Sequence, residues 1–373
     1  IKNDATSKIT TTKITETTTA IPSGTGEVKL GGNAKVDVAG RAVQFFEVTK
    51  PSWGGTAEFV SETGNVEFVA GSKVNVSAAA GGDAGTLIVR AAKGTVLLAD
   101  GSVTGAAEAD ADGQRGEGAR ALIDTGTLAS FSTLNTALNS GGFDGERDLR
   151  VRTGDVSIAR TDVVKAQVIK ISADGDPSVV GDGKINVAGT LDASGKEAGR
   201  IELFAKHDVN VKSTAKLAAV SSGANEDGGD IVIGTRKGKL NLEASDPGKG
   251  IDVSGGAGGQ GGTVLLRAPR TRVVTNGVEV LDVAVTALSS TISGARSVSV
   301  EAVKVYNPGD IGTLDSATNT LSLATADFET IKNDNAAFAG HLDTGGNYVD
   351  HYAAIKDRLG QQTLHILSGV EVR

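Results

Sequence analysis

Glu108, Asp110 and Asp112 have the type and spacing that chemistry needs, since they alternate and would share one face of an extended segment. Carboxylates gathered on one face can act as general acid and base on a glycosidic bond. Gly113 follows them, so the segment is also similar to the front of a calcium-binding loop. The twelfth position of such a loop is Ala119 rather than Glu, and the bidentate ligand is missing. We interpret the segment as a solvated acidic loop, with calcium binding and catalysis as alternatives.

His341, Asp343, Asp350 and His351 form the only cluster of histidine and aspartate in the chain. Imidazole and carboxylate together suit zinc or manganese, so a metal site is one hypothesis. The linking residues 344–347 read Thr-Gly-Gly-Asn, which is typical of a plain connector between helices. We therefore favour a structural role and keep metal binding as the alternative.

Three arginines, Arg267, Arg270 and Arg272, follow closely on an alternating apolar run. Alternation places Arg270 and Arg272 on one face, where they could hold an acidic glycan. Paired surface charges are the ordinary alternative. The sequence contains no nucleophile elbow with a Ser-His-Asp set and no phosphate-binding P-loop, and its glycine run at 255–262 is typical of a turn.

Composition points to thin, layered packing rather than a thick core. Of 373 residues 39% are hydrophobic but only 3% aromatic, and there are 51 Gly against 6 Pro. Glycine reaches positive φ without steric cost, so many short strands joined by sharp turns are expected. The net charge of −8 argues against non-specific binding to nucleic acid. Cysteine is absent, which excludes disulfides and thiol chemistry, and no apolar run approaches the ~20 residues of a membrane span.

One sequence motif recurs along the chain. It consists of an apolar–polar–apolar triplet followed by Ser, then a glycine-rich turn, then a strand with alternating apolar residues. Copies begin at Val74, Leu191, Ala218 and Ile251, and the last three follow one another at spacings of about 20 to 35 residues. Sandwiches and barrels use tight hairpins with turns such as Asn-Gly, and the sequence contains one Asn-Gly, at Asn276-Gly277. The spacing is that of a solenoid, and it predicts an all-β, right-handed parallel β-helix. At about 22 residues per coil and ~4.8 Å per rung, about 300 residues would make a rod roughly 65 Å long.

The repeat resembles the passenger region of filamentous-haemagglutinin-type exoproteins of the two-partner secretion family. The resemblance rests on Gly189–Gly195 (GTLDASG), on Gly250–Gly256 (GIDVSGG) leading to Gly261–Pro269 (GGTVLLRAP), and on the closing run at 364–372. Clear repeats cover about residues 65–270, with weaker ones to about 325, and the family's secretion domain is not visible. The resemblance implies a right-handed parallel β-helix at the bacterial cell surface, exported through an outer-membrane two-partner transporter.

The two ends differ from the repeats. Residues 1–22 are Thr-rich and predict an extended segment or spacer, in which Ile9, Ile14 and Ile21 are candidates for self-association. Residues 23–326 are expected to form the β-helix. Residues 327–373 predict a small helical cap or insertion and a final strand. The spacing there predicts one helix through Tyr348, Tyr352, Ile355 and Leu359, ended by Gly360, and a shorter one opened by Asp327, Phe328 and Ile331.

These observations predict a non-enzymatic extracellular rod that is structural or adhesive, without a cofactor unless calcium binds. Its expected partners are a glycan or protein on a host or neighbouring cell, or copies of itself joined end to end in a fibre. Insertion into a membrane is not expected. Because the chain begins at Ile1 and holds no Met, we expect a processed or trimmed piece of a longer protein. The alternatives are the stem of a larger toxin-delivery or adhesin protein and a polysaccharide-degrading β-helix enzyme.

Overall fold

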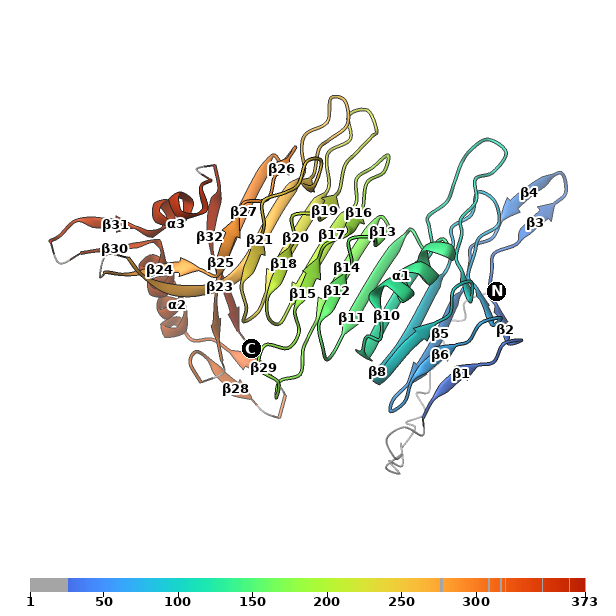
Figure 1. Cartoon of the computed structure of the whole chain (residues 1–373), viewed down its shortest axis with the longest axis horizontal. Helices are drawn as coiled ribbons and strands as arrows, with labels where there is room; N and C mark the ends of the chain where they lie inside the picture. Colours follow the sequence, from blue (N-terminus) through green and yellow to red (C-terminus); the bar gives the residue numbers. More distant parts are fainter. Residues whose placement is uncertain are drawn as a thin grey trace, which may run out of the picture.

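The chain is a rod of stacked strands, as the computed structural model shows in Figure 1. The structure describes residues 26–372 apart from 276, 277, 308, 316, 319, 344 and 362. The Thr-rich segment with Ile9, Ile14 and Ile21 lies outside the described residues. The early strands stand at one end of the long axis and the last two helices at the other (Figure 1).

One long sheet, here called the main sheet, runs along the rod, and successive coils pair in parallel. β8 is long, so its first half pairs with β5 and β10 and its second half with β6. In spatial order its strands are β1 (Val28–Leu30), β6 (Val66–Phe68), β8 (Thr86–Leu98), β10 (Arg120–Thr127), β11 (Glu146–Val151), β14 (Val168–Ala173), β17 (Arg200–Ala205), β20 (Asp230–Thr235), β23 (Thr263–Thr275), β27 (Ser297–Tyr306) and β32 (His365–Val372), with β5 (Thr56–Ser61) on β8 and β24 (Val278–Val283) on β23.

Shorter sheets form the other faces of the coils. The second sheet contains β12 (Val156–Ile158), β15 (Ile185–Val187), β18 (Val209–Val211), β21 (Leu240–Leu242) and β25 (Val285–Leu288). The third contains β13 (Val163–Lys165), β16 (Thr190–Asp192), β19 (Lys216–Ala218), β22 (Gly250–Asp252) and β26 (Ile292–Ser293). Nearer the N-terminus, β2 (Lys35–Asp37), β7 (Lys73–Asn75) and β9 (Val103–Thr104) pair with one another. Antiparallel hairpins leave the coils at β3–β4 (Ala42–Phe45, Val48–Pro51), β28–β29 (Thr313–Asp315, Thr320–Ser322) and β30–β31 (Gly340–Leu342, Tyr348–Asp350).

Aliphatic side chains stack inside the rod because the parallel register brings equivalent positions of successive coils together. One such ladder on the main sheet starts at the aromatic Phe59 and continues through the aliphatic side chains of Val89, Ile123, Leu149, Ile171, Leu203, Ile233, Leu266, Val300 and Ile366. These side chains pack into one buried core. The predicted parallel β-helix is confirmed, and its ladders explain why the chain uses Val, Ile and Leu rather than aromatics.

A helix that the repeat pattern did not predict interrupts the coils. α1 (Phe131–Ser140) lies between β10 and β11, where the neighbouring coils have strands of the shorter sheets. The Ser130 side chain caps it by accepting from the Thr133 N–H, and Phe131, Leu134 and Leu138 are buried against the rod. Its polar residues and the expectation of a strand in every coil hid this helix in the sequence.

The predicted helical region near the C-terminus is an insertion. The last strand, β32, pairs with β27 and so continues the main sheet, and the intervening chain carries α2 (Thr325–Ala339) and α3 (His351–Leu359). Gly360 ends α3 in the left-handed conformation with φ 66°, as predicted. The helix opened near Asp327 has 15 residues against 9 in α3, so its prediction as the shorter one is wrong. Tyr348 lies in β31 rather than in the helix.

The insertion is part of the rod's core and not a separate unit. Phe338, Ile355 and Leu359 are buried in the same hydrophobic cluster as the ladders. Arg358 of α3 donates from its guanidinium to the carboxylate of Asp282 and to the Val285 carbonyl, so α3 is fixed to the end of the second sheet. Among the described residues no helix is long and apolar enough to cross a membrane.

Candidate functional site

The predicted acidic group lies in the loop between β9 and β10. Glu108 and Asp112 are exposed, and Asp110 uses one carboxylate oxygen to accept from the backbone N–H groups of Asp112 and Gln114 at 2.9 and 2.8 Å. Hydrogen bonds from an aspartate side chain to the backbone that follows it are typical of a turn. In the part of the chain that the structure describes, no three His, Asp or Glu side chains come together to hold a metal.

The histidine and aspartate cluster is a hairpin packed on a helix. His341 Nδ1 lies 2.9 Å from His351 Nε2, and buried His351 directs its Nδ1 to the Phe338 carbonyl at 3.2 Å. Asp343 accepts from the turn N–H groups that follow it, and Asp350 caps α3. Both carboxylates therefore accept hydrogen bonds from the local backbone.

The three arginines differ in their surroundings. Arg267 forms ion pairs with Glu301 at 2.9 Å and Glu371 at 3.4 Å, across β23, β27 and β32. Arg270 reaches the Ala302, Asp334 and Gly369 carbonyls at 3.1 to 3.3 Å, and its guanidinium lies over the Phe338 ring at 4.6 Å. Arg272 is exposed. Arg267 and Arg270 thus join strands and helix within the chain, and neither gives support to the predicted glycan contact.

Sequence reasoning missed a charged cluster on the outer face of the main sheet. Parallel register places Asp148 beside Lys170 and Lys170 beside Glu202 on successive strands, with Glu146 at the start of β11. Glu146 is 7% exposed and accepts from Arg120 Nε at 2.7 Å and from Lys170 Nζ at 2.8 Å. These residues are 22 to 32 positions apart where they pair, so only the coil register could have brought them together.

The two carboxyls of β11 have opposite electrostatic surroundings. Burial acts to raise the pKa of Glu146, but the hydrogen bonds from Lys170 and Arg120 outweigh it, and the pKa lies below its usual range. Burial raises the pKa of Asp148, and the nearby Glu146 and Glu202 add to the effect while Lys170 opposes it. A carboxyl with raised pKa beside an ionised one is an arrangement that acid–base chemistry uses.

A mutant pair tests this electrostatic contrast. The folded-state pKa of Asp148 lies above its unfolded value of 3.8, so ionised Asp148 opposes folding at neutral pH and the penalty fades as the pH falls through the folded pKa. Asp148→Asn should therefore raise the free energy of unfolding at pH 7, by up to about 1 kcal/mol for a partly exposed group.

Glu146→Gln is the matched opposite. The stability from Glu146 is present above its unfolded value of 4.5 and is lost as the pH falls through the lowered folded pKa. This variant should lose about 1–2 kcal/mol at pH 7, since its hydrogen bonds are charge-assisted. Urea unfolding at pH 7 and near pH 4 measures the free energy of unfolding of both variants. An Asp148→Asn variant less stable than the original chain at pH 7 would contradict the raised pKa of Asp148.

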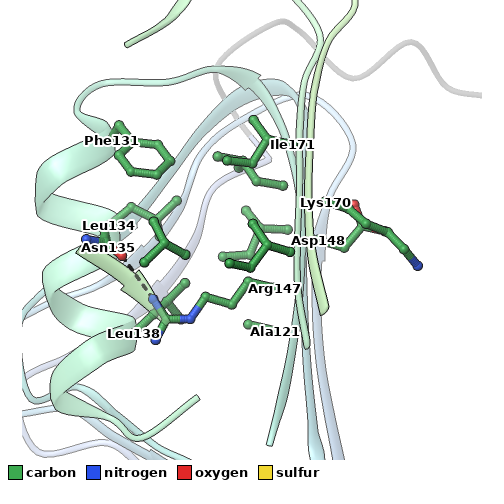
Figure 2. Close-up of a pocket in the computed structure, with 13 residues that line it drawn as sticks. Ala121, Phe131, Leu134, Asn135, Leu138, Arg147, Asp148, Lys170 and Ile171 are labelled. Atoms are coloured by element: carbon green, nitrogen blue, oxygen red, sulfur yellow. Dashed lines mark hydrogen bonds between the residues drawn. The ribbon is translucent and has the colours of Figure 1, made fainter. Parts of the chain in front are cut away.

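A second feature missed by the sequence reasoning is a buried arginine beneath α1. Arg147 occupies an inward position of β11, between Ala121 and Ile169 of the adjacent coils, and is only 6% exposed. Its guanidinium points across the interior to α1 (Figure 2), where it donates to the Phe143 carbonyl at 2.7 Å and to Asn135 Oδ1 at 2.9 Å. Burial lowers the pKa of Arg147 to about 10. The alternation of Arg147 with Leu149 and Val151 was the available sequence signal.

A small cavity adjoins this network. It has a volume of about 30 Å³ and lies between α1 and the main sheet, among Phe131, Leu134, Leu138 and Ile171 (Figure 2). That is room for little more than one water molecule. The region under α1 is therefore a structural junction rather than a ligand site.

A groove runs along the rod at the strand starts of the main sheet. Two adjoining hollows of about 540 and 460 Å³ share Gln167, Val168 and Glu197. They are lined by the first residues of successive strands, which are Arg120, Glu146, Val168, Arg200 and Asp230. The lining mixes both signs of charge, and the groove is long and shallow. Such a surface suits an extended polar partner better than a compact small molecule.

Comparison with protein-family models, curated proteins and solved structures finds no match to this chain.

Proposed function

We propose that the chain is a non-enzymatic extracellular rod, structural and adhesive, that joins end to end into a fibre on a bacterial surface. The observation that carries the proposal is the main sheet, which passes through every coil from β5 to β32 with a continuous apolar ladder beneath it. A ladder bonded at each rung resists bending, because every coil shares its backbone hydrogen bonds with the next. A stiff spacer of this kind would act through its length and through the surface that it presents, rather than by catalysing a reaction.

The adhesive part of the proposal rests on the groove. It follows the rod axis across five strands and offers paired charges and an amide along its length. Extended glycans or a protein segment on a host or neighbouring cell would meet repeating polar groups there. The resemblance of the repeats to filamentous-haemagglutinin-type exoproteins supports the same role and an export route through an outer-membrane two-partner transporter.

The charged cluster on the outer face favours one second candidate. Asp148, with its raised pKa, beside ionised Glu146 and Lys170 is the carboxylate group that a polysaccharide-degrading β-helix enzyme needs. Incubation with acidic polysaccharides and measurement of new chain ends separates the two functions. Release that is lost in Asp148→Asn would replace our proposal, whereas binding without release supports it.

Electron microscopy of the purified chain tests the fibre. We expect single rods at low concentration and rods joined along their long axis at high concentration. The same measurement without residues 1–20 examines the predicted self-association segment at Ile9, Ile14 and Ile21. Isolated rods at all concentrations, in both samples, would contradict the fibre and leave only an adhesive shaft or stem.

A further inference from the structure

The β3–β4 hairpin leaves the rod near its N-terminal end and carries an aromatic residue at its tip. Phe46 is 98% exposed and has φ 55°, in the left-handed region. Two-residue hairpin loops that need this conformation favour Asn or Gly, and for a bulky side chain it is strained. Strain of this kind persists where a function needs it. The Phe46 ring is exposed and contributes nothing to the rod's own core.

Other exposed apolar side chains lie on the same hairpin or directly after it. Val43 is 40%, Val48 53% and Trp53 75% exposed. Val43 and Val48 share one face of the hairpin, since they occupy alternate rungs of its antiparallel register. We call Val43, Phe46, Val48 and Trp53 the N-terminal patch. Clustered exposed apolar groups of this kind mark interaction sites.

A second apolar hairpin lies at the opposite end of the rod. Leu342 and Tyr348 face each other across β30–β31 and are 67% and 62% exposed. Figure 1 places β3–β4 and β30–β31 at opposite ends of the long axis. We call Leu342 and Tyr348 the C-terminal patch. The two patches are thus positioned to meet between consecutive rods and not within one.

The charges around the patches have opposite sign. Residues 41–51 of the first hairpin carry Arg41 and Lys50 against Glu47, a net charge of +1. Residues 325–360 of the insertion carry six Asp or Glu against three Lys or Arg, a net charge of −3. Opposite charges favour contact between unlike ends, and like charges oppose contact between identical ends.

We propose that the N-terminal patch of one copy docks on the C-terminal patch of a second copy, so that rods join head to tail. A contact between two different surfaces of neighbouring copies forms a closed ring only when the rotation from copy to copy closes. Otherwise the copies extend into a filament. This inference rests on the proposed fibre and names its joint.

The test uses the full chain with Phe46→Asn and, separately, Leu342→Thr. Asn accepts the left-handed conformation and Thr suits a strand, so both variants should keep the fold. Val180→Asn is the matched control, because Val180 is also 98% exposed but lies in a loop of the middle coils. Sedimentation measures assembly over a concentration series. We expect each end variant to weaken assembly at least about tenfold and the control to assemble like the original chain.

Mixing the two end variants gives the sharpest result. Phe46→Asn keeps a sound C-terminal patch and Leu342→Thr a sound N-terminal patch, so their equimolar mixture should form dimers with one good joint although neither variant assembles alone. Leu342→Thr that still dimerises by itself would overturn the head-to-tail contact in favour of two N-terminal patches. Assembly lost on removal of residues 1–20 but kept in Phe46→Asn would overturn this joint and leave the fibre. An original chain that never assembles would overturn both.

Discussion

Asn135→Ala should lower the free energy of unfolding by about 2–4 kcal/mol, although the residue lies in a helix outside the repeat pattern. Asn135 is buried and uses both ends of its amide: Oδ1 accepts from Arg147 and Nδ2 donates to the Val163 carbonyl at 3.1 Å. Alanine would leave a buried guanidinium with one acceptor fewer, and a buried charge without its partner is costly.

Asn139→Ala is the matched control. Asn139 also donates to the Val163 carbonyl, at 2.9 Å, but it is exposed and has no hydrogen bond to Arg147 in the structure. Its loss should cost less than about 1 kcal/mol, because Asn135 still satisfies that carbonyl. Urea unfolding gives both values. In an Arg147→Met background Asn135→Ala should cost clearly less, and equal costs in both backgrounds would show that the two side chains do not act together.

Arg270→Ala should destabilise the C-terminal insertion by about 3–5 kcal/mol, since it removes one guanidinium that joins three segments. Arg270 of β23 donates to the backbone of β27, α2 and β32 and covers the Phe338 ring. Without it these carbonyls lose donors, and the buried ring loses its cover. Hydrogen exchange should speed up in α2 and β32 while β14 and β17 keep their protection.

Two further variants identify the cause. Arg270→Lys keeps the charge but not the planar fork that reaches several acceptors, so it should behave much like alanine. Arg267→Ala, on the same strand, removes ion pairs that are partly exposed and should cost about 1 kcal/mol or less. If Arg270→Ala bound acidic glycans less well without faster exchange in α2, the surface role predicted from the sequence would be restored.

The sequence was informative wherever local alternation and the coil period agree. As expected, β17 contains Ile201-Glu202-Leu203 and β23 contains Val264-Leu265-Leu266. The first and third residue of each triplet is buried in the core. Gly360 ended α3 for the predicted reason, because glycine accepts a left-handed C-cap without strain. Such signals need only neighbouring residues or one regular repeat.

The contacts between charged side chains of different coils could not be predicted from the sequence, because they depend on the register between coils. The Glu146–Lys170 pair and the Asp148–Lys170 neighbours are defined by which residues stack, and the irregular coil that contains α1 shifts that count. Alternation with Leu149 and Val151 indicates an inward Arg147, but its partner Asn135 is not evident until α1 is known to lie opposite it. Phe46 was not singled out, because neither its strained backbone nor its exposure is visible in residue type alone.

The interruption at α1 has a mechanical consequence. On either side of it the rod is tied by strands on several faces, but across this coil the strand ladder that continues is that of β10 with β11. It is supplemented by the bond from the Gly105 N–H to the Gly141 carbonyl and by side-chain contacts of α1 such as Ser132 with Asp162. A fibre held in flowing liquid carries tension along its axis. In the proposed fibre that tension would concentrate at this coil, so α1 would decide where the rod yields first.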